Sequence, residues 1–451
     1  MSNISQLGQE FGQYLLQLTA ELLAGPKQAQ SLSEMERQIR ALLLKAGQFL
    51  LSSWLALQES AYADERVACP HCEQEASYKC KRKGTLWTIL GQVTYKRAYY
   101  LCQGCHQGHF PLDQKLGLRP GQMSAELESL SGMTGAQLPF GQSSALFERL
   151  TLLSVSDHSV AKATQAMGEE AQVQEQEWLA QSQDADWLQE QQRLAERPKR
   201  LYGSLDAAKV HIRGEEEHPW RDLKVGAWFT TVAEPPQSPD EDWSIQATDI
   251  SYYCDIQPAQ QFGHLVWATG CQRHAQLAHE LIFLGDGAEW IWNLVAEHFP
   301  EAIQIVDWFH ATEYIAPVAN ALFSDESQRK AWIKQVRTQL WDGQLEQVIA
   351  AFAPFTDHPK AADPASNAFT YFTNNQHRMD YPSYRQQGYQ IGSGTIESAC
   401  KQIVSQRLKV TGAIWDIDNA VKTAKARAAL LSDQWDTLTA RRQFLALPLA
   451  L

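Results

Sequence analysis

The stretch from Glu280 to His310 constrains the fold more than any other part of the chain. A short apolar run is closed by Gly285-Asp286-Gly287, an amphipathic helix follows, and a second apolar run, Ala302 to Val306, ends on Asp307. This order is typical of an open α/β sheet, in which ligands bind beyond the carboxyl ends of the strands. We therefore expect Asp286 and Asp307 to lie side by side at one edge of a sheet.

Both aspartates also have a purely local interpretation. Asp286, between two glycines, is typical of a turn, and Asp307 is a good N-cap for the helix that carries His310. Taken alone, this stretch leaves both interpretations open.

Two Cys-x-x-Cys motifs form the strongest local signal in the chain. They contain Cys69 with Cys72 and Cys102 with Cys105, and the segment from Gly84 to Tyr100 between them alternates like a β-hairpin. Four thiolates at this spacing can surround Zn²⁺ tetrahedrally and leave no open position for a substrate. The pattern predicts a zinc ribbon whose metal is structural and replaces a hydrophobic core.

The predicted ribbon is basic and rich in tyrosine. Its candidate DNA contacts are Lys81, Arg82, Lys83 and Arg97. Clustered cations interleaved with aromatic rings suit a nucleic-acid backbone, whereas a merely solvated charged face is the alternative.

The composition limits the class of protein. A net charge of -13 argues against uniform coating of nucleic acid but leaves room for a local basic patch. No apolar run approaches the roughly 20 residues of a membrane span. Because Met1 to Gln30 lacks the features of a signal peptide, we expect a cytoplasmic protein with eight reduced or metal-bound cysteines.

Four regions follow from the patterns. We expect an N-terminal helical region (1–66), the zinc ribbon (67–118), a helical region and linker (119–197) and an α/β domain (198–451). A capping box at Ser33 and Glu36 predicts a helix from about Met35 to Leu57, in a packing or dimerising helical hairpin. Residues Ser144 to Gly168 suit a helix-turn-helix or a plain helical hairpin.

The last region begins with an antiparallel meander. Its three predicted strands are Leu201 to Ile212, Leu223 to Val232 and Trp243 to Cys254. A helical stretch around Arg273 to His279 and the Asp286 strand follow, which is the order of an RNase H-like domain. Asp206 lies inside the first strand, where a buried carboxylate is costly unless it is paired or holds a cation.

A helical block at about 312–388 separates these strands from a second glycine-rich segment. There, Gln390-Ile-Gly-Ser-Gly-Thr-Ile-Glu-Ser-Ala-Cys-Lys puts Glu397 on the first turn of a helix, with Lys401 one turn later. A simple i,i+4 pair is the alternative. Five further cations make this end locally basic: Arg407, Lys409, Lys422, Lys425 and Arg427.

Four motifs together resemble those of the bacterial insertion-sequence DDE transposases of the ISKra type, which are similar to Mutator-like transposases. They are Ser-Leu-Asp206, Gly-Asp286-Gly-Ala-Glu-Trp-Ile, Val-Asp307-Trp-Phe-His310 and Ile-Gly-Ser-Gly-Thr-Ile-Glu397-Ser-Ala-Cys-Lys. The resemblance covers nearly the whole chain. It implies an RNase H-like catalytic core with a helical insertion, in which Asp206, Asp286 and Glu397 are the catalytic triad and Asp307 and His310 form a D-x-x-H motif.

The resemblance implies an enzyme that binds the ends of its insertion sequence, cleaves the DNA and transfers the strand with two Mg²⁺ or Mn²⁺ ions. Three carboxylates are suitable ligands for such hard cations. We expect Asp206 to bridge both ions, Asp286 and Glu397 to complete one site each, and Asp307 to position His310. Lys401, Arg407 and Lys409 are further candidate DNA contacts, and Trp290 or Trp292 is a candidate for base stacking.

The same resemblance implies a nucleoid-associated protein that acts as a homodimer or higher oligomer on terminal repeats and target DNA. Two alternatives stay open. One is a captured transposase that acts only as a zinc-dependent DNA-binding regulator, against which the intact triad argues. The other is an RNase H-like nuclease that cuts without joining.

Overall fold

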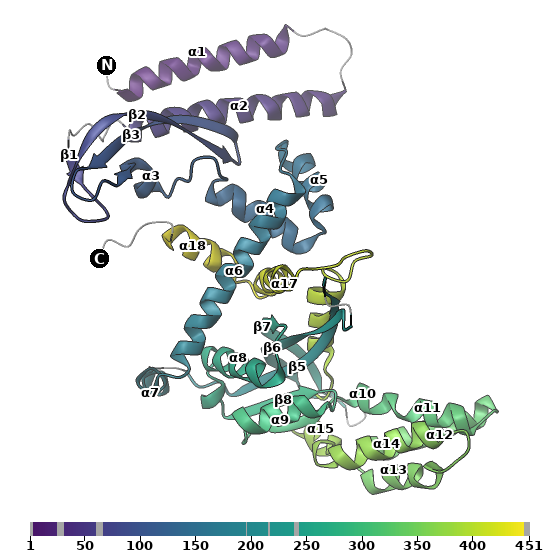
Figure 1. Cartoon of the computed structure of the whole chain (residues 1–451). Helices are drawn as coiled ribbons and strands as arrows, with labels where there is room; N and C mark the ends of the chain where they lie inside the picture. Colours follow the sequence, from purple (N-terminus) through teal and green to yellow (C-terminus); the bar gives the residue numbers. More distant parts are fainter. Residues whose placement is uncertain are drawn as a thin grey trace. The chain divides into compact units, whose positions relative to one another are not determined.

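The structure is a computed structural model that describes residues 3–24, 31–59, 66–194, 196–214, 217–238 and 243–445. It is a mixed α/β protein with two compact units (Figure 1). The first unit contains Met1–Glu170 and Trp435–Leu451, and the second contains Ala171–Gln434. Within the described ranges, no helix combines the length and the apolar character needed to cross a bilayer.

The first unit begins with the expected helical pair, α1 (Asn3–Leu23) and α2 (Leu32–Glu59). The Tyr14 and Phe49 rings stack at 4.7 Å and join the two helices. The predicted capping box is wrong by two residues, because α2 begins at Leu32 and the Glu34 N–H donates to the Ser31 hydroxyl instead. The sequence also predicts a break between these two helices at Gly25-Pro26, which lies outside the described residues.

A four-stranded antiparallel sheet follows, in the order β1 (Arg66–Ala68), β2 (Glu75–Thr88), β3 (Gly91–Cys102) and β4 (Gly108–His109). The predicted hairpin is confirmed, and it is longer than expected. Helix α3 (Pro111–Leu116) packs on it, since the Tyr95 hydroxyl donates to Asp113 at 2.7 Å.

Further helices lie in the first unit: α4 (Ala125–Gln137), α5 (Phe140–Thr151) and α18 (Trp435–Leu445). Helix α6 (Asp157–Gln181) begins in the first unit and ends in the second, which also contains α7 (Ala185–Leu194). The expected turn between α5 and α6 is present, and the Ser156 hydroxyl accepts from the Ser159 N–H at 3.2 Å. Helix α6 continues past Gly168, and Trp435 of α18 donates to Ser129 of α4 at 3.0 Å.

The second unit is built on a mixed five-stranded sheet in the order β7-β6-β5-β8-β9. Strands β5 (Arg200–His211), β6 (Trp220–Glu234) and β7 (Ser244–Asp255) form the predicted antiparallel meander. Strand β8 (Glu280–Gly285) runs parallel to β5, and β9 (Ile303–Val306) runs parallel to β8. The carboxyl ends of β5, β8 and β9 therefore lie at the same edge.

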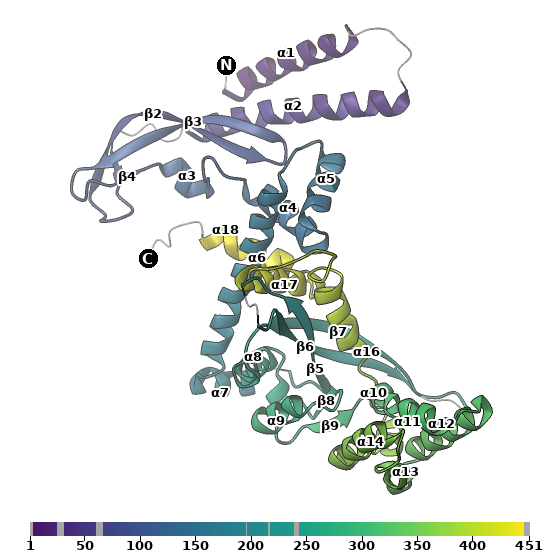
Figure 2. The same ribbon diagram turned by 45° about the vertical axis from the view of Figure 1, so that its right-hand side comes forward.

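Helices cover both faces of this sheet (Figures 1 and 2). On one face lie α8 (Ala259–Gln272) and α9 (Glu289–His298), where Gly270 lies so close to the Trp228 ring that a Cβ would come within 2.8 Å of it. On the other lie α16 (Gly394–Ala399), a π-helical turn (Cys400–Ser405) and α17 (Ile417–Leu431). Lys425 of α17 donates to the Cys254 carbonyl of β7 at 2.7 Å.

The helical stretch predicted around Arg273 to His279 is confirmed only in part. The helix at this point is α8, which ends at Gln272. His274 adopts a left-handed conformation with φ of 56°, which stops the helix, and only a 3₁₀ turn, Ala275–Leu277, follows.

The predicted helical block is confirmed. It contains α10 (Trp308–Glu313), α11 (Ile315–Leu322), α12 (Glu326–Trp341), α13 (Leu345–Phe352), α14 (Ala362–Asn375) and α15 (Tyr381–Gln386). Phe352 is fully buried and stacks on Phe372 with ring centroids 5.4 Å apart.

Candidate metal centres and the acidic site

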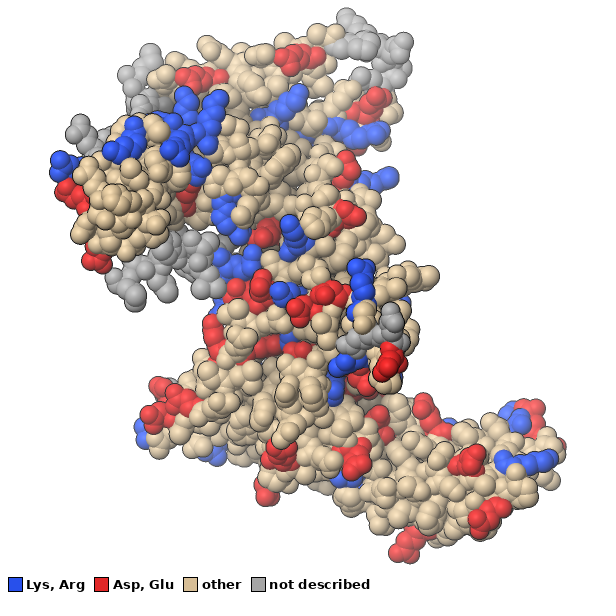
Figure 3. All heavy atoms as spheres, viewed as in Figure 1, with Lys and Arg blue, Asp and Glu red and all other residues tan. Residues whose placement is uncertain are grey.

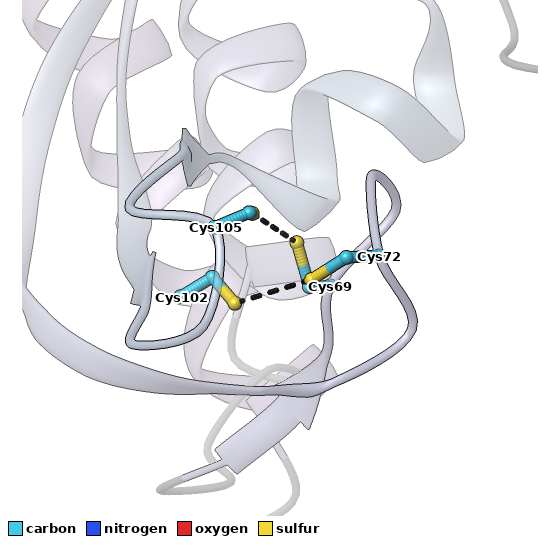
Figure 4. Close-up of side chains that lie close together, drawn as sticks. All are labelled: Cys69, Cys72, Cys102 and Cys105. Carbon is cyan, nitrogen blue, oxygen red and sulfur yellow. Dashed lines mark hydrogen bonds between the residues drawn. The ribbon is translucent and has the colours of Figure 1, made fainter.

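The four predicted cysteine ligands lie together (Figure 4). Cys69 and Cys72 come from the segment between β1 and β2, whereas Cys102 ends β3 and Cys105 follows it. The four Sγ atoms lie within 4.8 Å of one another, with Cys69 3.6 Å from Cys105 and Cys72 3.5 Å from Cys102.

These sulfur positions fit a zinc ion. A tetrahedral site with Zn–S bonds of about 2.3 Å places its sulfurs about 3.8 Å apart. The backbone N–H of Cys105 donates to the Cys102 sulfur and, against the effect of burial, lowers the pKa of that thiol to about 7, which favours the metal-binding thiolate. All eight cysteines are free thiols, as expected, and these four could hold one zinc ion.

Strand register determines the second site. Ser204 of β5 pairs with Leu284 of β8, so Asp206, two residues later, is level with Asp286. Gly285 of β8 pairs with Val306 of β9, so Asp286 is in turn level with Asp307. Three aspartates therefore form one row across three neighbouring strands, at the edge where ligands bind in open sheets.

Two of these aspartates also make the local interactions that the sequence allowed. The Asp286 carboxylate accepts from the Ala288 N–H at 2.9 Å, as in a turn. Asp307 is fully buried and caps α10 by accepting from the His310 N–H at 2.6 Å. Its other oxygen accepts from the Ser393 N–H, which ties the end of β9 to the loop before α16.

Glu397 enters the site from α16. The Ser393 hydroxyl donates to Glu397 at 2.8 Å, and His310 Nε2 lies 3.7 Å from the same carboxylate oxygen. The Glu397 side chain is 50% exposed. Asp307, His310 and Glu397 each offer one ligand atom within 4.8 Å of the others, so this trio could hold a metal ion.

Asp206 lies beside this trio without joining it. Burial raises the pKa of Asp206, the nearby Asp286 charge raises it further, and a hydrogen bond from the Cys400 thiol and the nearby His310 lower it. Among the described residues, the predicted set of Asp206, Asp286 and Glu397 does not form one ligand cluster with these side-chain positions.

The candidate DNA contacts differ in how accessible they are. Lys and Arg side chains gather over β2 and β3 (Figure 3). Arg97 is occupied by an ion pair with Asp113, and its guanidinium lies 3.8 Å from the Phe110 ring centroid. The residues that the structure leaves exposed are Lys81, Arg82, Lys83, Lys401 and Lys409.

The prediction is corrected at Arg407, which is 1% exposed and therefore cannot reach DNA in this fold. Burial lowers its pKa to about 10, and its guanidinium lies 5.5 Å from the Trp415 ring centroid. Lys425 and Arg427 are also buried, so much of the expected basic end of the chain is interior. Trp292 is 4% exposed and packs in the core rather than being free to stack on a base.

Cys400 is a site neighbour that the sequence did not reveal. Its thiol donates to Asp206, and it begins the π-helical turn directly after α16. The sequence shows that Cys400 lies three residues after Glu397. The residue types do not indicate which strand its side chain would face.

No protein-family model matches the chain, and no curated protein is significantly similar to it. Its function is therefore inferred from its own residues.

Proposed function

We propose that this protein is a DNA transposase that binds the ends of an insertion sequence and catalyses metal-dependent DNA cleavage and strand transfer. The row of Asp206, Asp286 and Asp307 across β5, β8 and β9, with Glu397 entering beside His310, carries this proposal. The sheet order, three antiparallel strands followed by two parallel ones, supports an RNase H-like core.

The donor set fits Mg²⁺ or Mn²⁺. Asp206 and Asp286 are like charges close enough to interact, and burial already disfavours ionised Asp206. A cation beside them relieves both effects. Bound Mg²⁺ or Mn²⁺ would activate the attacking oxygen and stabilise the leaving one in an in-line displacement at phosphorus.

Each residue then has a role. Asp206, Asp286 and Glu397 would hold the ions, with Asp206 on β5, the middle strand of the sheet. Among the described residues, the Ser393 hydroxyl and His310 hold the half-exposed Glu397 side chain in its present position, and a turn of this side chain toward the two aspartates would complete the set. His310 orients the scissile phosphate, and Asp307 fixes the backbone of α10 from which His310 projects.

The proposed partner is DNA. The exposed cations Lys81, Arg82 and Lys83 support contact of the ribbon with the phosphate backbone, and Lys401 lies one turn from Glu397. The zinc-dependent regulator without catalysis and the nuclease that cuts without joining remain the alternative functions. Either one would use the same basic ribbon.

The test is cleavage of a labelled duplex that carries the terminal repeat of the protein's own element, with Mg²⁺ or Mn²⁺. Each single substitution Asp206→Ala, Asp286→Ala and Glu397→Ala should lower the rate at least about a thousand-fold, or about 4 kcal/mol in the barrier. The losses should not add, because the three residues serve one shared site.

The matched control is Glu346→Ala, which removes an exposed carboxylate from the helical block and should leave cleavage unchanged. DNA binding in metal-free buffer should survive in all four variants. Equal nicking by wild type and the three site variants would refute the proposed triad, and a wild type that binds but never nicks would favour the regulator.

A further inference from the structure

A cation-rimmed groove lies in the helical block, outside the acidic site. Its rim carries Lys330, Lys334 and Arg337 of α12, and its floor includes Trp308 of α10 and Trp341 at the end of α12. The three cations recur at intervals of four and three residues, which places them on one face of the helix over about 10 Å. All three are exposed.

The charge of this groove is largely uncompensated. Lys330 pairs with Glu326 at 2.7 Å, but both side chains are exposed, and such a pair exchanges easily with another anion. Within the described part of the chain, no carboxylate pairs with Lys334 or Arg337. The Arg385 guanidinium lies 3.7 Å from the Trp341 ring centroid and holds this ring in place, so it is not one of the uncompensated cations.

The floor is aromatic and held in position. The Trp308 and Trp341 rings meet edge to face with centroids 4.8 Å apart. Trp308 is 7% exposed and mainly supports the partly exposed Trp341, which is the ring that a ligand can contact. A preformed aromatic surface under a cationic rim suits a ligand that has both phosphates and stackable rings.

The groove also adjoins the acidic site. Trp308 follows the buried cap Asp307 and lies two residues before His310. The backbone N–H of Trp308 donates to the Ile391 carbonyl at 2.9 Å, in the segment that leads to Ser393 and Glu397. The groove and the candidate metal ligands therefore share helix α10, although none of these ligands lines the groove.

We propose that this groove binds a single-stranded segment of nucleic acid, with phosphates on Lys330, Lys334 and Arg337 and a sugar or base against the partly exposed Trp341. A single strand fits better than a duplex, because only unpaired bases can use the aromatic surface. A position of this single-stranded segment next to the bond that is cut rests on the proposed transposase function. Its binding in the groove does not.

The test uses the full-length protein in metal-free buffer and a labelled single-stranded oligonucleotide, with affinity measured by fluorescence anisotropy at several salt concentrations. The double substitution Lys334→Gln with Arg337→Gln should weaken single-strand binding about tenfold. It should also make the salt dependence shallower, by about 1.4 in the log–log slope, since each phosphate contact on a single strand contributes about 0.7. Trp341→Phe should weaken binding without changing that slope.

The matched control is Lys199→Gln with Lys360→Gln, which removes two exposed charges from the same unit outside the groove. Equal weakening by both double variants, or no weakening by the groove variant, would overturn the proposal. Competition with polyglutamate would also overturn the proposal if, per charge, it displaced the labelled strand as effectively as unlabelled oligonucleotide does. The groove would then be a general anion site. Failure of the cleavage test would leave this binding result intact, which separates the two proposals.

Discussion

The cysteine cluster and the acidic site represent two ways of building a candidate metal centre. The cysteines lie in two short motifs at adjoining ends of one hairpin, so pairing β2 with β3 is enough to bring Cys69 and Cys72 to Cys102 and Cys105. The acids instead come from strands and helices spread over most of the second unit. A local motif can encode the first site, whereas the second exists only after the whole sheet has formed.

The two regions also differ in what supports them. The ribbon has a small core, in which Tyr100 and Ala76 are fully buried beside the cysteines. The second unit has one large apolar core and a buried ion cluster, in which Lys425 of α17 lies 2.5 Å from Glu175 and 3.0 Å from Asp255. We therefore expect the ribbon to depend on metal and the acidic site to depend on tertiary packing.

Removing the zinc should produce the largest effect. Structural zinc sites contribute roughly 10 kcal/mol or more to local folding, so Cys102→Ser should abolish amide protection in the ribbon. Hydrogen exchange should detect this loss, and metal analysis should find about one zinc per chain in wild type. The control is Cys80→Ser, an exposed cysteine outside the cluster, which should keep both zinc and protection. Protein prepared without chelator that contains no zinc would contradict the assignment.

Breaking the buried ion cluster should have the next largest effect. Although burial lowers the pKa of Lys425, the carboxylates of Glu175 and Asp255 raise it overall, so the lysine is charged. Lys425→Met leaves two buried carboxylates without their cation and should lower the free energy of unfolding of the second unit by about 3–5 kcal/mol.

Urea unfolding followed by site-resolved hydrogen exchange measures this change. Lys409→Met removes an exposed lysine from the same end of the chain and should cost little. Because the cysteine cluster is local, ribbon protection should be the same in both variants. A ribbon that loosens together with the second unit would remove the distinction between the two regions.

The pH dependence of the metal-free protein should show the smallest effect. Burial, with a further contribution from Asp286, raises the pKa of Asp206 above its ordinary value of 3.8. Just above that pH the folded protein binds more protons than the unfolded chain, so stability contributed by Asp206 falls as pH rises through this window. Asp206→Asn should flatten this part of the stability curve, and saturating Mg²⁺ should flatten it in wild type. A wild-type curve that rises across the window and is unchanged by Asp206→Asn would show that Asp206 is not held in this environment.

The sequence was most informative where interactions are short in range. Alternation of apolar residues predicted β5, β6 and β7, and helical spacing predicted α1, α2 and the helical block. The Cys-x-x-Cys spacing identified all four members of the cysteine cluster. Helix ends were predicted less accurately: Ser31 rather than Ser33 caps α2, and the left-handed His274 follows the end of α8 where a helical stretch was expected. These ends depend on which of several suitable residues the chain actually uses.

Tertiary structure decided the rest. A strand's alternation tells which side chains share a face but not their partners, so the row of Asp206, Asp286 and Asp307 appears only from the register of β5, β8 and β9. Basic residues near the end of the chain looked alike in sequence, yet packing of α17 against the sheet buries Lys425 beside two carboxylates and leaves Lys409 exposed. A charged side chain is buried only where other elements supply its partners, and residues distant in sequence supply them here.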